Sequence, residues 1–160
     1  MIIRRANDGD LNGIWETISP AIQAGETLAL PRDMTREAAL AFWMGPDRET
    51  YVAEEGDRVI GTYYVRANQA GGGSHVANGG YITARDAAGR GIARAMCTHS
   101  LHRASELGFR AMQFNFVVST NERAVRLWQS LGFEIVGTLP GAFEHPSLGY
   151  VDAYVMFREV

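Results

Sequence analysis

A glycine-rich turn between a strand-like run and an amphipathic helix is the feature that most constrains how this chain can fold. The run from Gly79 to Thr83 leads into the turn, and apolar residues from Ile92 onward recur at helical spacing. Gly89 and Gly91 form the turn, and a turn of this kind points unpaired backbone N–H groups at one place. The helix dipole adds partial positive charge there, and Arg90 adds a formal charge. The turn therefore predicts a phosphate-binding site.

Spacing excludes two common nucleotide-binding motifs. A dinucleotide-binding fingerprint needs a third glycine, and Arg94 stands where that glycine would be. A P-loop needs lysine and then serine or threonine after its second glycine, and the sequence contains no such run.

The pattern of elements predicts an α/β (α+β) fold, with one mixed sheet of about seven strands flanked by about four helices. We expect residues 1–160 to form a single domain. The strand-like runs are 2–6, 50–54, 58–67, 75–83, 109–118, 133–139 and 150–157. The main helices are expected to begin after Asp8, after Thr35, at Ile92 and after Asn121, with Asp8, Thr35 and Asn121 as N-caps.

Two segments are expected to interrupt these elements. Ser19-Pro20 should break the first helix, because a proline removes a backbone donor and clashes with the preceding turn. A further short helix would then end at Gly25. The run from Pro140 to Gly149 contains proline and glycine and is expected to be a loop between the last two strands.

The composition excludes several classes of protein. The formal net charge of -3 argues against a nucleic-acid binder. Cys97 is the only cysteine and stands at an apolar helical position, which predicts a reduced core residue. The N-terminus is charged too early for a signal peptide, and no apolar run reaches the roughly 20 residues of a membrane span. We therefore expect a cytoplasmic protein that binds neither nucleic acid nor membrane. His99 and His102 lack further ligands nearby in the sequence, so no metal site is expected.

Three pieces of the sequence together resemble the GNAT family of N-acetyltransferases. The pieces are residues 81–83, 88–93 and 121–133. The family's pyrophosphate motif, [Q/R]-x-x-G-x-[G/A], maps onto Ala88, Gly91 and Ala93, with alanine in place of the usual first residue. Its second signature, N-x-x-A-x-x-L-Y-x-x-x-G-F, is met over residues 121–133 except that Trp128 replaces tyrosine. The expected element order also resembles this fold over essentially the whole chain.

The resemblance implies acetyl-CoA as co-substrate. It places the pyrophosphate on the N–H groups of Gly89 to Ala93 and the pantetheine arm along the main chain of Tyr81 to Thr83, where a backbone N–H would also polarise the thioester carbonyl. Arg85, Arg90 or Arg94 would compensate for the side chain missing at Ala88. The implied cofactor-binding residues are Tyr81, Ile82, Thr83, Ala88, Gly89, Arg90, Gly91, Ile92, Ala93, Arg94, Asn121, Ala124 and Trp128.

The implied chemistry is direct attack of an amine on the thioester in a ternary complex, and no Ser-His-Asp or Cys-His set suggests a covalent intermediate. The candidate catalytic residues are Asn78, Asn115 and Asn121. An amide cannot act as a general base, but it can orient a water or hold a substrate carboxylate. The indole of Trp128 is too weak an acid to protonate the departing thiolate. Water, another tyrosine or the product ammonium would supply that proton.

Residues 75–78 and 115–121 are similar to a narrower branch, the fungal acetyltransferases that detoxify the proline analogue azetidine-2-carboxylate and their bacterial relatives. That similarity implies a small amine acceptor, an amino acid or proline-like imino acid, with Asn78 and Asn115 in its pocket. Glu26 and His75 are further substrate-site candidates, although ordinary loop roles are the simpler interpretation of both. The sequence leaves open a protein or peptide acceptor, a non-catalytic acyl-CoA-binding module, and a homodimer.

Overall fold

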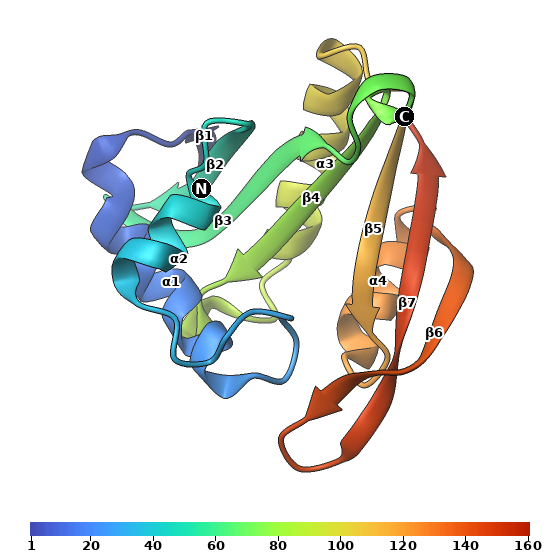
Figure 1. Cartoon of the computed structure of the whole chain (residues 1–160). Coiled ribbons are helices and arrows are strands. Elements are labelled where there is room, and N and C mark those ends of the chain that lie inside the picture. The colour runs from blue at the N-terminus through green and yellow to red at the C-terminus, as the bar shows by residue number, and fades with distance from the viewer.

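The computed structural model describes residues 1–160 and contains one seven-stranded mixed sheet in the order β1-β2-β3-β4-β5-β7-β6. This confirms the predicted fold class (Figure 1). The strands are β1 (Ile2–Arg5), β2 (Arg48–Glu55), β3 (Arg58–Ala67), β4 (Val76–Thr83), β5 (Ala111–Val118), β6 (Glu134–His145) and β7 (Gly149–Glu159). The α-helices are α1 (Leu11–Ala24), α2 (Arg36–Trp43), α3 (Ile92–Glu106) and α4 (Glu122–Ser130). None of the helices is long and apolar enough to cross a membrane.

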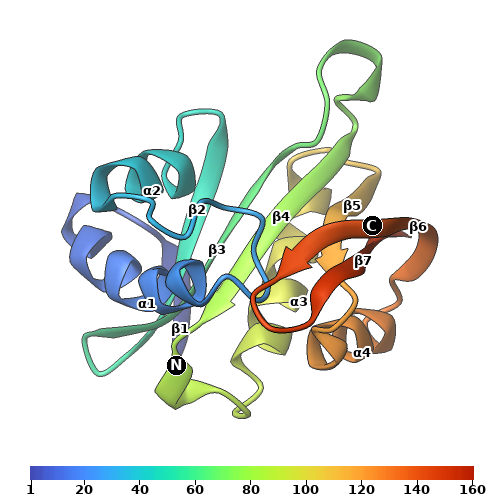
Figure 2. The ribbon, with the colours of Figure 1, turned by 60° about the horizontal axis from the view of Figure 1, so that its bottom comes forward.

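The helices cover both faces of the sheet, α1 and α2 on one and α3 and α4 on the other (Figures 1 and 2). Each pair of helices buries its own apolar cluster against the strands. On the α1/α2 face the indole Nε1 of Trp43 donates to Thr62 Oγ1 at 2.9 Å, and Thr62 Oγ1 donates to the Tyr51 carbonyl at 2.8 Å. The larger cluster, under α3 and α4, extends across β3, β4 and β5 and so supports the strands that carry the site.

The first helix is continuous, so the break predicted at Pro20 is wrong. Ile14, Ile18 and Ile22 are all at most 1% exposed and stand four residues apart on the buried face of α1. Fully burying each such side chain is worth about 1.5–3 kcal/mol. Continuing the helix through Ile22 therefore offsets the roughly 3 kcal/mol that an interior proline costs.

The start of this helix also differs from the prediction. A short 3-10 turn, Asp8–Asp10, precedes α1, and its N-cap is Asn7, whose side chain accepts from the Gly9 N–H at 2.8 Å. Asp8 lies inside this turn and is not a cap, and Asp10, directly before α1, makes no side-chain capping bond to the helix. The carboxylate of Asp10 accepts from the Asn7 N–H at 2.8 Å and so completes a capping box. Thr35 is confirmed as the cap of α2, because its hydroxyl accepts from the Ala38 N–H at 3.2 Å.

The segment predicted as a loop between the last two strands is mostly strand, so that prediction is wrong. Only residues 146–148 connect β6 to β7, in a long hairpin (Figure 1). The register shifts between Leu139 and Phe143, which indicates a bulge at Pro140 and Gly141. A bulge accommodates a residue that lacks an N–H and a glycine with a positive φ without ending the strand.

The central strands β4 and β5 run parallel and separate after a short paired segment. Only Val76–Ala111 and Ala77–Met112 are in register, and the strands then diverge (Figure 1). Where the ladder stops, Asn78 Nδ2 donates to the Gln113 carbonyl at 3.0 Å. The side chain of Asn78 thus bridges the two strands directly after their last paired residues.

Candidate active site

The glycine-rich turn leaves a row of backbone donors unpaired at the N-terminus of α3. Gly89 and Gly91 have φ values of 81° and 78°, a region that glycine adopts with little strain. The N–H groups from Gly89 to Arg94 donate to no acceptor in the protein. A Cβ at Gly91 would have no heavy atom within 4 Å, so the main chain lies open at this point. The geometry is that of an anion-binding turn.

These donors face a cavity of about 560 Å³ between the turn and α4, which we call the turn cavity. Most of the predicted cofactor-binding residues lie in its wall. The lining residues are Tyr81, Thr83, Ala88, Gly89, Gly91, Ile92, Ala93, Arg94, Asn121, Arg123, Ala124, Arg126, Leu127, Trp128 and Ser130. The structure therefore brings together β4, the turn and α4, which are separate in the sequence.

The side chain of Arg90 is not part of this cavity. Its Nη2 lies 2.8 Å and 2.9 Å from the two carboxylate oxygens of Glu55 in the β2–β3 turn. Arg94 does line the cavity, where its Nη2 donates to Ser130 Oγ at 2.9 Å. Arg123 and Arg126 of α4 add two guanidinium groups that the sequence interpretation missed. Their three-residue spacing, which puts both on one helix face, was the available signal.

Asn121 and Trp128 stand at the inner end of the turn cavity. Asn121 occupies the N-cap position of α4, but its side chain makes no capping hydrogen bond, so the predicted side-chain cap is wrong. Trp128 is 8% exposed, and its ring packs 5.2 Å from Tyr81 and 5.1 Å from Phe114 between centroids. The indole N–H of Trp128 has no acceptor in the protein, and its nitrogen is not fully enclosed. The donor is therefore available to a ligand.

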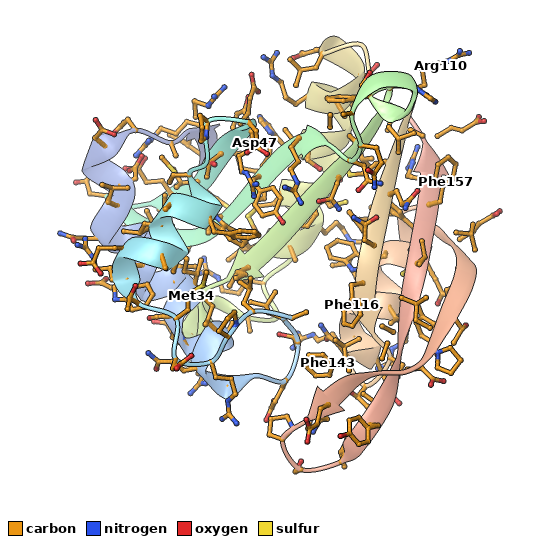
Figure 3. The ribbon with its side chains drawn as sticks, viewed as in Figure 1. Met34, Asp47, Arg110, Phe116, Phe143 and Phe157 are labelled. Carbon is orange, nitrogen blue, oxygen red and sulfur yellow. The ribbon has the colours of Figure 1, made fainter.

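A second cavity of about 440 Å³, the strand cavity, occupies the gap between β4 and β5. Its lining residues are Ala21, Thr27, Leu28, Tyr64, Arg66, Asn78, Gly79, Gly80, Tyr81, Ile82, Thr83, Phe114, Asn115, Phe116, Val117, Val118, Asn121, Ala124 and Trp128. Tyr81, Thr83, Asn121, Ala124 and Trp128 belong to both walls, so the cavities meet there. Figure 3 shows Phe116 near Phe143 of the hairpin, at a centroid distance of 6.2 Å.

Both predicted strand asparagines line the strand cavity, and their amides are already hydrogen-bonded. Asn78 is 6% exposed, and its Oδ1 lies 3.4 Å from Arg66 Nε in addition to the bond across the gap. Asn115 is exposed, and it donates to Asn68 Oδ1 at 2.6 Å while accepting from Gln113 Nε2 at 2.9 Å. The fixed amides present oriented dipoles to the cavity.

Two other predicted substrate residues do not line this cavity. Glu26 is exposed after α1, and its neighbours Thr27 and Leu28 form the wall instead. His75 precedes β4 and lines a different cavity with Arg110, which lies at the end of the molecule away from the hairpin (Figure 3). The interpretation from sequence overlooked Arg66, which does line the strand cavity.

The titratable side chains of Tyr81, Cys97 and His99 pack against core residues, and their contacts are structural. The Tyr81 hydroxyl lies 2.6 Å from Ser100 Oγ, and burial raises its pKa, so it is a poor proton donor. Burial also raises the pKa of Cys97 to about 12, and the residue is fully buried, as predicted. His99 Nδ1 lies 2.6 Å from the Tyr63 hydroxyl, and burial lowers the pKa of His99. His99 is thus paired with a core tyrosine.

Comparison with known proteins identifies similar sequences and structures. A model described as the acetyltransferase (GNAT) family matches residues 15–133, a span that includes the lining of both cavities. The N-acetyltransferase aca1 of Schizosaccharomyces pombe is 30% identical over 155 residues, which cover 86% of this chain and 74% of that protein.

Two solved structures resemble the whole fold. A GCN5-related N-acetyltransferase from Kribbella flavida is 44% identical with a TM-score of 0.94, covering 99% of this chain and 97% of its own. The yncA protein of Salmonella typhimurium, solved with its cofactor acetyl-CoA, is 21% identical with a TM-score of 0.87, covering 99% and 93%. The second likeness concerns the fold alone.

Proposed function

The chain belongs to the GNAT acetyltransferase family and is an acetyl-CoA-dependent N-acetyltransferase, and on this premise we propose that its acceptor is the amine of a small molecule, an amino acid or proline-like imino acid. The same proposal treats residues 1–160 as one catalytic domain, because the two cavities together draw on residues from α1 to α4.

The turn cavity fits the cofactor's phosphates. The free N–H groups from Gly89 to Arg94 would hold the pyrophosphate, and the helix dipole favours its charge. Arg94, Arg123 and Arg126 supply guanidinium groups in the same wall, in place of the side chain absent at Ala88. When bound, acetyl-CoA supplies the acetyl thioester.

The diverging strands fit the rest of the cofactor. Beyond Ala77, β4 has no ladder partner on its β5 side, so this edge carries unpaired main-chain groups along Tyr81 to Thr83. These groups would hydrogen-bond the pantetheine arm as an added strand does, and a backbone N–H there would polarise the thioester carbonyl. The free indole N–H of Trp128 would donate to the sulfur.

The strand cavity would hold the acceptor beside the thioester. Its wall contains no Asp, Glu, His or Cys, which favours direct attack by a neutral amine over a covalent intermediate. Asn78 and Asn115 would orient the acceptor, or a water that accepts the proton of the acceptor amine. Asn121, which lies where the two cavities meet, would orient the reacting groups in the same way. Tyr64 is the other tyrosine in this wall, and burial raises its pKa.

The observation that carries the small-molecule proposal is the bounded size of the strand cavity. At about 440 Å³ it lies within the range of small-molecule sites. Thr27 and Leu28 line it on one side, and the segment after α1 lies beside the β6–β7 hairpin in two views (Figures 1 and 2). A small acceptor would fit within this volume, whereas a peptide would extend beyond it.

Thiol release from acetyl-CoA tests the proposal directly. The assay would compare amino acids, imino acids, polyamines and short peptides as acceptors, with the product identified by mass. The chain contains no lysine, so its N-terminal amine is the main site of self-acetylation to control for. Turnover confined to peptides would overturn the small-molecule proposal. Tight acetyl-CoA binding without transfer to any amine would indicate a binding module instead.

A further inference from the structure

We propose that Arg66 binds an anionic group of the acceptor, a carboxylate, and thereby selects amino and imino acids over simple amines. This inference rests on the proposed function, because it assumes that the strand cavity is the acceptor site. Arg66 is the only residue in the wall of that cavity with a charged side chain. Since the wall has no carboxylate to balance it, the cavity favours an anionic ligand.

Arg66 is oriented by its neighbour across the ladder, Asn78. It lies directly opposite Asn78 in the β3–β4 ladder, and its Nε lies 3.4 Å from Asn78 Oδ1. Because Asn78 Nδ2 is bonded to the Gln113 carbonyl, the amide that orients Arg66 is itself held by β5. The side chain of Arg66 is 28% exposed, so the guanidinium is partly desolvated and still reachable.

Only one carboxylate, that of Asp47, is close to Arg66, and Arg48 also binds it. Asp47 Oδ2 lies 3.6 Å from Arg66 Nη1, a loose contact to a side chain that is 59% exposed. The same Asp47 accepts from Arg48 Nε at 2.8 Å, and this bond is the main reason that its pKa is lowered. Asp47 is therefore committed to Arg48, which leaves Arg66 free to bind a ligand.

A second guanidinium adds to the positive potential behind the cavity. Arg48 is 6% exposed and stacks on Phe42 and Tyr64, with its Cζ at 4.8 Å and 4.6 Å from their ring centroids. Its Nη1 has no hydrogen-bond partner. The pair Arg48 and Arg66 faces the single carboxylate of Asp47, so a net positive charge remains next to Tyr64 in the cavity wall.

The distance along β4 bears on how an acceptor would reach Arg66. Asn78, level with Arg66, lies three residues before Tyr81, or about 10 Å along the strand. Tyr81 belongs to the wall that the two cavities share. An α-amino acid is much shorter than this distance, so its carboxylate would meet Arg66 where the long arginine side chain extends along the cavity toward the junction.

The test compares acceptors that differ only in the carboxylate. Wild-type protein and Arg66→Gln would be assayed with proline against pyrrolidine and with alanine against ethylamine. We expect Arg66→Gln to lower kcat/KM for each acid about 10- to 100-fold, because a charged hydrogen bond is lost. The change for each plain amine should stay within about threefold, and so should the KM for acetyl-CoA.

A second variant keeps the inference testable if Arg66→Gln unfolds. Asp47→Asn removes the one negative charge close to Arg48 and Arg66, so the positive potential beside the cavity rises; the variant should lower KM for the acids and leave the plain amines unchanged. Equal effects of both variants on acids and amines, in a wild-type enzyme that acetylates both, would overturn the inference and leave the proposed function standing. Failure of the wild-type protein to acetylate any small amine would overturn both.

Discussion

The open turn at Gly91 supports a prediction that separates backbone strain from charge. Gly91 has a φ of 78°, and a Cβ there would meet no heavy atom within 4 Å. Alanine would therefore fit sterically and pay only the strain of a left-handed backbone, about 1–2 kcal/mol. For a protein of this size the loss corresponds to a drop in Tm of about 2–8 °C. Gly91→Glu has the same backbone strain and adds one negative charge.

The charge should decide cofactor affinity. The carboxylate of Gly91→Glu would stand beside the donors from Gly89 to Arg94, where the pyrophosphate is proposed to bind. Two unit charges roughly 6 Å apart interact by about 3 kcal/mol at an effective dielectric constant of about 20. That energy corresponds to about a 100-fold weaker Kd for each unit of phosphate charge. Gly91→Ala should weaken binding less than about tenfold.

Calorimetric titration with acetyl-CoA would measure both variants, and thermal unfolding without ligand would measure the strain. We expect similar Tm values for the two variants and a Kd at least 100-fold weaker for Gly91→Glu than for Gly91→Ala. If the two variants bind acetyl-CoA with similar affinity, the pyrophosphate does not lie on this turn.

Three further predictions concern stability and the cofactor. Thr62→Val should destabilise the fold by about 1–3 kcal/mol in urea unfolding, because the buried indole N–H of Trp43 loses its acceptor; a loss below about 0.5 kcal/mol would contradict this. Hydrogen bonds from Arg103 hold the pKa of Glu49 at about 2, below its ordinary 4.5. The contribution of this pair to stability is thus complete above about pH 4.5 and falls as the pH drops toward 2, so the Tm difference between wild type and Arg103→Met should shrink from pH 6 to pH 3. Arg126→Gln should weaken acetyl-CoA binding several-fold and reduce its salt dependence, and an unchanged Kd would place the phosphates elsewhere.

The sequence predicted most of the wall of the turn cavity, because the core of that wall is a glycine-rich turn built from backbone. A turn with two glycines before a helix leaves N–H groups free whatever the neighbouring side chains are. The direction of a long side chain is different, since it depends on partners that are distant in sequence. Arg90 belongs to the turn but pairs with Glu55, 35 residues away. Arg126 was missed although it lines the same cavity.

The wall of the strand cavity depends on tertiary pairing and was predicted less completely. Asn78 and Asn115 were found because polar residues inside central strands stand out in the sequence. Arg66 did not stand out, because an arginine near a strand end is ordinary; only the β3–β4 register places it opposite Asn78. The wrong prediction of a helix break at Pro20 has a similar origin, because burial of the helix against the sheet outweighs the low helix propensity of proline.

Because β4 and β5 are paired only at one end, the sheet consists of two parts that can rotate relative to each other about that end. The two halves of the sheet are joined at Val76–Ala111 and Ala77–Met112, and the part of β4 that has no partner in β5, from Asn78 to Thr83, is about 20 Å long. A rotation of about 5° at the joined end would move the open end by about 2 Å over that length. A ligand that touches β4 on one half and α4 on the other fixes this spacing. Under the proposed function, cofactor binding and the fit of the acceptor would therefore be coupled through the width of this gap.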